Sequence, residues 1–251
     1  MEYGMQGQVA LVTGAARDVG RQIALGLAAE GATVAVNYNS SPKEAEAVVA
    51  EIVARGGKAR AYGANVVDRA AVKAMVDQVA QDFGRLDILV NNAGLVLRQR
   101  FTDTTQQDWD AQIGVGLFGV LNTCHAALPY MEKNKFGRII SLAGDSARVG
   151  ESGLAVTAAA RGGVLAFTKS IAKEFGRFNV TANAVTLGLI ATAHTDPVWL
   201  ETNREKIVRQ YPLRRIGESE DVAPMVLFLA SKQASWITGQ GVSVNGGFAM
   251  G

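Results

Sequence analysis

A glycine-containing turn between a short apolar run and an amphipathic stretch constrains the fold of this chain most. The run 9–13 is rich in strand-favouring residues and leads directly into the turn 14–20. Beyond the turn, apolar residues recur at helical spacing until Gly31. A strand, a tight turn and a helix in this order predict the first unit of a parallel α/β sheet.

The same alternation repeats along the whole chain. It predicts a Rossmann-type, doubly wound parallel sheet of about seven strands, with helices on both faces, in a single domain. The stretch 189–217 is the longest irregular segment, and we expect it to cover a substrate at the carboxyl edge of the sheet. Strands are predicted at 9–13, 32–37, 58–65, 86–90, 138–142, 180–186 and 241–244, and helices from the first turn to 31 and at 42–55, 68–83, 105–133, 157–175 and 219–231.

Composition excludes several classes of function. The 25 Lys and Arg residues nearly balance the 23 Asp and Glu residues, which leaves no electrostatic footprint for nucleic acid. Cys124 is the only cysteine, so no internal disulfide forms, and with His125 and His194 it gives no metal-ligand spacing. No apolar run approaches the length of a membrane span. We therefore expect a cytoplasmic protein without a structural metal, a nucleic-acid partner or a membrane partner.

The first turn has the composition of a dinucleotide site. Gly14 and Gly20 let the backbone approach a pyrophosphate, and the following helix offers free N–H groups and a positive dipole end. The second strand ends at Asn37, without the acidic residue that binds a ribose 2′-hydroxyl and repels a 2′-phosphate. With Arg17 nearby, NADP(H) is favoured over NAD(H) if either is bound.

Asp18 in the same turn argues against tight binding. A carboxylate beside a pyrophosphate repels it, so we expect cofactor binding to be weak or absent. The other interpretation of Asp18 is a helix N-terminal residue that the dipole favours.

Three motifs in register resemble the short-chain dehydrogenase/reductase (SDR) family, and most of all its 3-oxoacyl-carrier-protein-reductase-like branch. They are the turn from Thr13 to Gly20, the element 91–94 with the sequence Asn-Asn-Ala-Gly, and the tail motifs at 238–240 and 245–247. The resemblance covers essentially the whole chain and implies an NAD(P)-dependent oxidoreductase scaffold. The cofactor-binding residues that we expect are Gly14, Arg17, Asp18, Gly20, Asn37, Asn65, Val66, Asn91, Ala93 and Gly94.

The chain departs from this family at the positions that carry its chemistry. The resemblance implies a Tyr as general acid/base, a Lys four residues later, a Ser thirteen residues before the Tyr and a helix Asn that anchors a proton relay. This sequence has Thr157, Arg161, Gly144 and Gly116 at those positions. The well-matched flanking segments fix the alignment, and no tyrosine occurs between 130 and 211.

The replacements cannot perform the family's acid catalysis. A threonine hydroxyl is a far weaker acid than a phenol, and loss of a positioned acid costs about 10²- to 10⁴-fold in rate. Arg161 shares a helix face with Thr157 and can bind a ribose hydroxyl or an anionic ligand, but it cannot act as a tuned acid. We expect Asp145, Ser146 and Arg148 to form a solvated loop, Cys124 to pack in the core and His194 to lie on the surface.

Three functional hypotheses remain. The first is a non-catalytic subunit that supports an active SDR paralogue in a hetero-oligomer. The second is an unorthodox oxidoreductase, such as an enoyl-type C=C reductase, in which hydride transfer needs less acid assistance. The third is a protein that senses a nucleotide or an acyl ligand.

The family resemblance also implies a dimer or tetramer, formed by the helices predicted at 105–133 and 157–175. In the second helix, Val164 and Ile171 belong to a stripe that faces the sheet, whereas Ala158, Gly162 and Leu165 form a face small enough for close helix approach. We expect this face to be buried against a second copy or an SDR paralogue.

Overall fold

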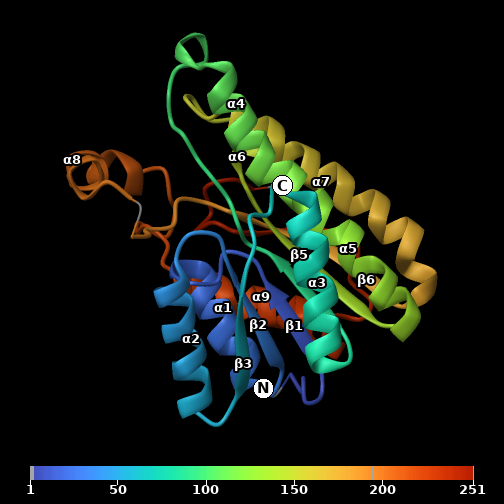
Figure 1. Ribbon diagram of the computed structural model, residues 1–251. Helices are drawn as coiled ribbons and strands as arrows, with labels where there is room; N and C mark the ends of the chain where they lie inside the picture. Colours follow the sequence, from blue (N-terminus) through green and yellow to red (C-terminus); the bar gives the residue numbers. More distant parts are fainter. Residues whose placement is uncertain (1–2, 194, 251) are drawn as a thin grey trace.

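Seven parallel strands form one sheet in the order β3-β2-β1-β4-β5-β6-β7 (Figure 1). The computed structural model describes residues 3–193 and 195–250. The chain builds outward from β1 to β3 on one side and from β4 to β7 on the other, which confirms the predicted doubly wound sheet. The strands are β1 Val9–Val12, β2 Thr33–Tyr38, β3 Lys58–Gly63, β4 Ile88–Asn91, β5 Gly137–Gly144, β6 Val180–Leu187 and β7 Gly241–Val244.

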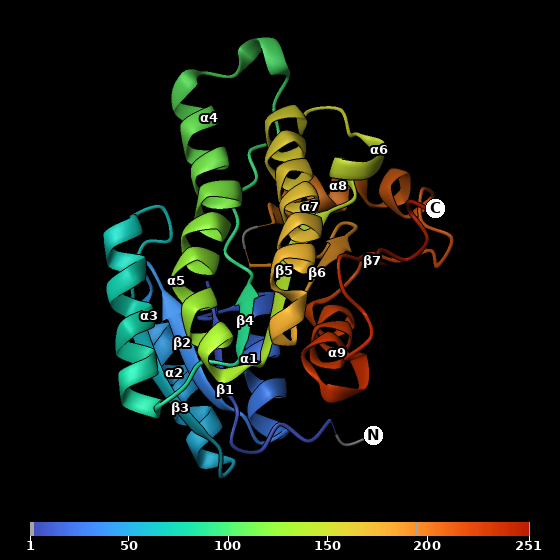
Figure 2. The same cartoon turned by 90° about the vertical axis from the view of Figure 1, so that its right-hand side faces the viewer.

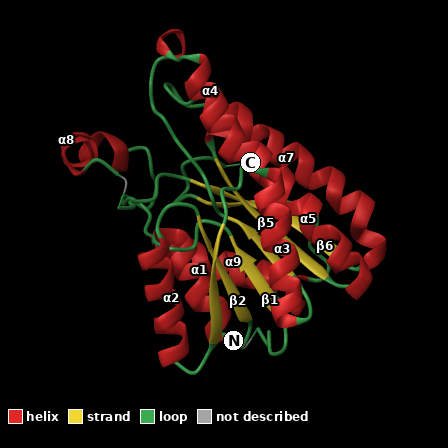
Figure 3. Cartoon of the chain, viewed as in Figure 1, coloured by secondary structure: helices red, strands yellow, loops and turns green. Residues whose placement is uncertain are grey.

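Helices cover both faces of the sheet (Figures 2 and 3). Helices α1, α2 and α9 pack on one face, and α3, α5 and α7 pack on the other. The α-helices are α1 Asp18–Ala29, α2 Pro42–Ala54, α3 Arg69–Phe83, α4 Gln106–Ile113, α5 Gly119–Asn134, α6 Ser146–Val149, α7 Ala155–Phe175, α8 Pro197–Val208 and α9 Ser219–Ala230.

The alternation of side chains in β1 shows why both faces are apolar. Ala10 and Val12 belong to the core cluster with α1, α2 and α9, whereas Val9 and Leu11 belong to the cluster with α3, α5 and α7. All four residues are buried. Successive strand residues point to opposite faces, so a central parallel strand must be apolar throughout its length.

The helix predicted at 105–133 is interrupted. Helix α4 ends at Ile113, a π-helical segment occupies Gly114–Phe118, and α5 continues from there. Glycines at 114, 116 and 119 weaken regular helix propagation at this point, and π-helical turns are frequent at functional sites. Within the described residues, 106–134 is the one helical stretch apolar and long enough for a membrane span. Half of its most apolar part is buried in the fold, as in the core helix of a soluble protein.

The stretch 189–217, predicted as irregular, contains helix α8. The Asp196 side chain accepts hydrogen bonds from the backbone N–H groups of Val198 at 2.9 Å and Trp199 at 3.2 Å, and Pro197 begins the helix. An acidic cap followed by proline is a helix-start signal, and it was present in the sequence. The segment projects from the carboxyl side of the sheet (Figure 1).

Candidate functional site

The turn after β1 forms a cradle in which Gly14 and Gly20 leave little room for a side chain. Gly14 has a φ of +61°, and a Cβ added to Gly20 would lie 2.4 Å from the Gly14 carbonyl oxygen. The N-terminus of α1 begins within this turn at Asp18. Close backbone and an open helix N-terminus are what a pyrophosphate requires, so the described residues fit the phosphates of a dinucleotide.

Thr13 and Asn92 hold this turn against the end of β4. The Thr13 hydroxyl oxygen accepts hydrogen bonds from the backbone N–H groups of Asn92 and Ala93, both at 3.0 Å. The Asn92 side chain in turn donates to the carbonyl oxygens of Thr13 at 2.9 Å and Gly14 at 3.0 Å. These two residues position the cradle, although the sequence analysis assigned them no separate role.

The Asn37 side chain lies inside the protein and does not face the cofactor edge. Its amide donates to the carbonyl oxygens of Tyr62 at 3.2 Å and Ala64 at 3.1 Å, and its oxygen accepts from the Gly14 N–H at 3.2 Å. The residue is 2% exposed. Asn37 therefore fixes the turn, and a direct contact of its side chain with a ribose, as the sequence suggested, does not follow from this geometry.

Arg17 is an exposed cation immediately before α1. Its guanidinium donates to the Ser41 hydroxyl at 3.1 Å, and both side chains are at the surface. Ser41 immediately precedes α2, so this pair stands at the edge of the turn beyond β2. A guanidinium and a hydroxyl at the surface are groups that can bind a phosphate.

Asp18 adopts a left-handed backbone conformation with a φ of +47°, at the place where the family has glycine. Its carboxylate accepts a hydrogen bond of 3.0 Å from the backbone N–H of Ala193 in the covering segment. The carboxylate therefore ties the phosphate turn to this segment while its charge remains at the turn.

The remaining predicted cofactor residues lie at the same carboxyl edge. Asn65 is exposed and Val66 is buried in the loop after β3, and Ala93 and Gly94 follow β4. Asn91 is 3% exposed and turned inward: its amide donates to the Ser141 hydroxyl at 3.1 Å, and its oxygen accepts from the Thr123 hydroxyl at 2.6 Å. Only backbone atoms of Asn91 are left for a ligand.

The Arg161 guanidinium occupies the space into which a side chain at position 144 would project. A Cβ added to Gly144 at the end of β5 would lie 2.0 Å from Nη1 of Arg161, which projects from α7. The guanidinium thus occupies the space of the serine side chain that the family resemblance implies at 144. Burial lowers the pKa of Arg161, and the nearby Glu151 carboxylate raises it. Among the described residues, no group forms a hydrogen bond or an ion pair with this guanidinium.

Thr157 is buried and its hydroxyl is already engaged. The hydroxyl donates to Oε1 of Gln112, and both residues are at most 3% exposed. The Gln112 oxygen also accepts from the Leu97 N–H at 3.3 Å. Gly116 lies in the π-helical segment, where an added Cβ would be 3.4 Å from the Ala160 side chain. Neither Thr157 nor Gly116 has a free proton donor: the Thr157 hydroxyl is bonded to Gln112, and glycine has no side chain.

Tyr211 is a phenol that the sequence analysis gave no role. It is 6% exposed, and its hydroxyl oxygen accepts a hydrogen bond of 2.8 Å from the backbone N–H of Leu189, just beyond β6. Burial raises the pKa of Tyr211, and the charges of Glu151 and Asp145 raise it further. A phenol with a raised pKa is a poorer acid, so Tyr211 does not replace the missing tyrosine.

Asp145 and Ser146 are buried, so the prediction of a solvated loop is wrong. They are 1% and 4% exposed, and Ser146 begins the short helix α6. The Asn245 side chain donates to one oxygen of Asp145, which ties this carboxylate to the C-terminal segment. Arg148 is at the surface and donates to the Ser243 hydroxyl. Helix α6 packs against α7, and Asn245 reaches Asp145 from the C-terminal segment; no local pattern predicts these contacts.

Cys124 packs in the core, as its place in an apolar helical stripe predicts. It is fully buried, and burial raises the pKa of its thiol to about 12, whereas the adjacent His125 is exposed. The two side chains therefore cannot act as a nucleophile-base pair. His194 lies outside the described residues. No group of His, Cys, Asp and Glu side chains in the described part of the chain has metal-binding geometry.

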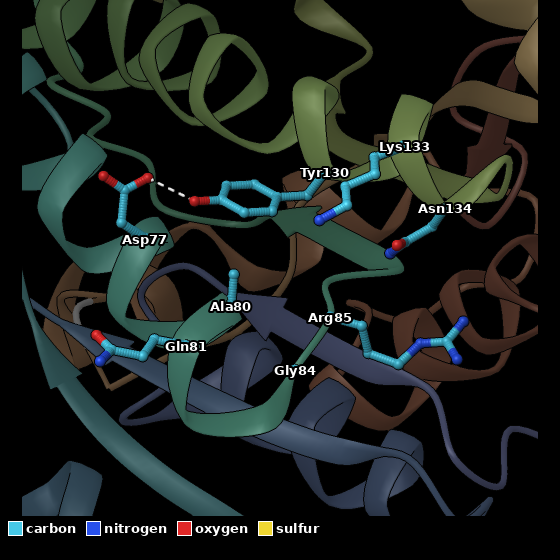
Figure 4. Close-up of a pocket in the computed structure, with 8 residues that line it drawn as sticks. All are labelled: Asp77, Ala80, Gln81, Gly84, Arg85, Tyr130, Lys133 and Asn134. Carbon is cyan, nitrogen blue, oxygen red and sulfur yellow. Dashed lines mark hydrogen bonds between the residues drawn. The ribbon is translucent and has the colours of Figure 1, made fainter.

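A pocket of about 240 Å³ lies away from this edge (Figure 4). It sits between the C-terminal ends of α3 and α5, where the strands begin, and the Tyr130 hydroxyl donates to Asp77 there at 2.8 Å. In open parallel sheets, ligands bind at the carboxyl ends of the strands. This pocket is therefore not the candidate active site. Its lining residues are Asp77, Ala80, Gln81, Gly84, Arg85, Tyr130, Lys133 and Asn134.

Comparison with known proteins agrees with this geometry. Residues 14–249 match the family model described as enoyl-(acyl carrier protein) reductase. The chain is 46% identical over 241 residues to 3-oxoacyl-[acyl-carrier-protein] reductase FabG of Staphylococcus aureus (strain Mu50), covering 96% of this chain and 98% of the relative. A 3-oxoacyl-[acyl-carrier-protein] reductase of Synechocystis sp. is 43% identical over 244 residues, with 97% of each chain covered.

Solved structures show the same fold. A putative short-chain alcohol dehydrogenase from Sinorhizobium meliloti superimposes with a TM-score of 0.94 at 31% identity, covering 99% of this chain and 98% of that one. A blue fluorescent protein from a metagenomic library, solved in complex with NADPH, gives a TM-score of 0.92 at 35% identity, with 98% and 100% covered. The glycine cradle, the strand order and these relatives together place the chain in the short-chain dehydrogenase/reductase family, in its 3-oxoacyl-[acyl-carrier-protein] reductase-like branch.

Proposed function

We propose that this chain is a nicotinamide-dinucleotide-binding SDR subunit that does not reduce carbonyl groups by itself. It acts in a cytoplasmic homo- or hetero-oligomer beside an active SDR paralogue. The proposal rests on Thr157, which stands where the family has its tyrosine acid. Thr157 is buried, and its hydroxyl donates a hydrogen bond to Gln112. A hydroxyl with so high a pKa, already bonded to an amide, has no proton to give a carbonyl oxygen near neutral pH.

The cofactor part of the proposal rests on the turn after β1. Gly14, Gly20 and the N-terminus of α1 would hold the pyrophosphate, and Arg17 with Ser41 favours NADP(H) over NAD(H). A bound nicotinamide cofactor supplies or accepts a hydride. The NADPH complex of the structurally similar blue fluorescent protein supports this assignment.

The assembly part rests on apolar surface beside the π-helical segment. Phe118 is 54% exposed and Val67 is 41% exposed on the side where α5 and α3 lie. In α7, Val164 and Ile171 pack in the core, while Gly162 has open space where a side chain would be and Leu165 is partly exposed. Large apolar side chains at the surface of a soluble domain favour burial against another subunit.

A comparison of two restored variants tests the proposal. We expect the wild-type chain to show no NADPH-dependent reduction of 3-oxoacyl thioesters. The fourfold variant Gly116→Asn, Gly144→Ser, Thr157→Tyr and Arg161→Lys should gain activity, while the same variant with Phe at 157 should gain none, because it lacks only the phenol proton. Wild-type turnover near 1 per second, within the ordinary range of enzymes, would refute the proposal. Loss of that turnover in Tyr211→Phe would then identify the acid.

An enoyl-thioester C=C reductase is the second candidate, and Arg161 favours it. The guanidinium at Gly144 places a positive charge where a thioester oxygen would become negative during hydride transfer. NADPH oxidation with a 2-enoyl thioester, but not with a 3-oxoacyl thioester, would favour this candidate, and loss of that activity in Arg161→Met would assign the role.

A further inference from the structure

Arg161 is a cation that the protein itself leaves without a partner. Its Nη1 lies against Gly144, and its guanidinium donates no hydrogen bond to any described residue. The residue is half-buried, and this burial lowers the pKa of its guanidinium. A half-buried guanidinium without a partner is costly in a fold unless a ligand pairs with it.

The charged groups around Arg161 leave its positive charge without a carboxylate partner. Glu151 is the acidic group whose field reaches Arg161, but its carboxylate is paired with Arg98 at 2.8 Å. Arg98 also donates to the Ser152 carbonyl oxygen at 2.9 Å, and its guanidinium lies 6.0 Å from the Trp199 ring centre in α8. The Arg98–Glu151 pair is neutral, and the Asp145 carboxylate that follows Gly144 is bonded to Asn245, so the Arg161 charge is left without a described carboxylate as its partner.

Exposed apolar side chains lie on the two segments that the Arg98–Glu151 pair joins. Leu95 and Val96 in the loop after β4 are 36% and 46% exposed, and Val149 at the end of α6 is 56% exposed. The backbone N–H of Gln99 donates to the Gly153 carbonyl oxygen at 3.0 Å, which holds the loops together. Both loops lie at the end of the molecule where α6 meets α7 (Figure 2).

We propose that Arg161, beside Gly144, binds a monocarboxylate with an apolar chain. The planar guanidinium offers two parallel N–H donors to one carboxylate, and the exposed apolar residues of the two loops suit an acyl chain. A phosphate dianion would need a second free cation, and a neutral ketone would leave the guanidinium charge unpaired. The inference rests on the proposed function in one respect, because Gly144 and Arg161 are two of the replacements on which the loss of carbonyl reduction is argued.

Calorimetry with hexanoate and its neutral isostere hexanamide tests this site, with and without saturating NADP⁺. We expect wild type to prefer hexanoate by about 10- to 100-fold, the range of a charge-assisted bidentate pair. Arg161→Met should abolish the preference and Arg161→Lys should reduce it, since lysine keeps the charge but not the fork. Gly144→Ser should also weaken hexanoate binding, because its Cβ displaces the guanidinium. The control Arg204→Met, at an exposed arginine of α8, should behave as wild type.

Two results would overturn the site. One is equal affinity of the wild type for hexanoate and hexanamide. The other is an Arg161→Met variant that keeps the hexanoate preference. If this variant also loses affinity for NADP⁺, the guanidinium serves the cofactor and not a carboxylate. Circular dichroism checks folding, and Arg161→Lys gives the answer if Arg161→Met does not fold. Turnover of 3-oxoacyl thioesters by the wild type would refute the proposed function and leave this binding measurement unaffected.

Discussion

Removing the charge of Asp18 should strengthen cofactor binding without a large change in stability. At about 6 Å from a pyrophosphate and an effective dielectric near 20, a carboxylate repels it by about 3 kcal/mol, or more than tenfold in affinity. Asp18→Gly relieves a left-handed conformation that costs on the order of 1 kcal/mol, and it loses the 3.0 Å bond to Ala193, worth about 1 kcal/mol. The two changes in unfolding free energy nearly cancel.

Asp18→Asn separates the charge from the backbone conformation. Asparagine tolerates the left-handed conformation and keeps an oxygen that can accept from Ala193, so it removes little except the charge. We expect calorimetry with NADP⁺ to show tenfold or greater tightening in both variants at low salt, with a smaller gain at high salt. Tightening in Asp18→Gly alone would mean that close backbone approach, and not charge, limits binding. If neither variant binds more tightly than wild type, the electrostatic argument fails.

Three further predictions concern packing, pH and assembly. Gly20→Ala should lower the unfolding free energy in urea by roughly 2–4 kcal/mol, because its methyl group would lie 2.4 Å from a backbone carbonyl oxygen; a loss below 1 kcal/mol would contradict this. Its control Gly176→Ala, with open space around the new methyl group, should gain up to about 1 kcal/mol. The Arg215 guanidinium lowers the pKa of Asp221 to about 2. The difference in unfolding free energy between wild type and Asp221→Asn should therefore be constant above about pH 4 and shrink toward pH 2. A difference in unfolding free energy that does not change with pH would show that the lowered pKa of Asp221 contributes nothing to stability. Leu165→Glu should convert an oligomer into monomers in light scattering, and a wild type that is monomeric at micromolar concentration, alone and with an SDR paralogue, would end the subunit hypothesis.

The arrangement of the sheet was predictable because its signals are local. The apolar period of each segment fixes strand or helix, and the strand-helix alternation fixes parallel crossovers. The same periodicity placed Cys124 in the core and separated it from the exposed His125. Helix α8 was missed although its signal, Asp196 followed by Pro197, was in the sequence, because the stretch carries little helical periodicity.

The site was less predictable because its contacts join distant segments. Asn37 ends the strand predicted at 32–37, but its side chain turns inward and donates to the carbonyl oxygens of Tyr62 and Ala64. Asp145 follows a glycine in a polar stretch, yet it is buried, and its carboxylate accepts a hydrogen bond from Asn245, one hundred positions later in the chain. Composition around a residue says nothing of which distant segment will pack on it.

The contact of Gly144 with Arg161 makes the two replacements interdependent. A serine at 144 would place its Cβ 2.0 Å from the guanidinium, so serine and arginine cannot both keep their positions. Restoring the serine alone should therefore displace Arg161, whereas the same change in an Arg161→Ala background meets no obstacle. In a double-mutant cycle of Gly144→Ser with Arg161→Ala, followed by urea unfolding, we expect a coupling of about 1 kcal/mol or more. Additive effects would show that the two side chains do not compete for one space, and the carboxylate site inferred from that contact would lose its geometric basis.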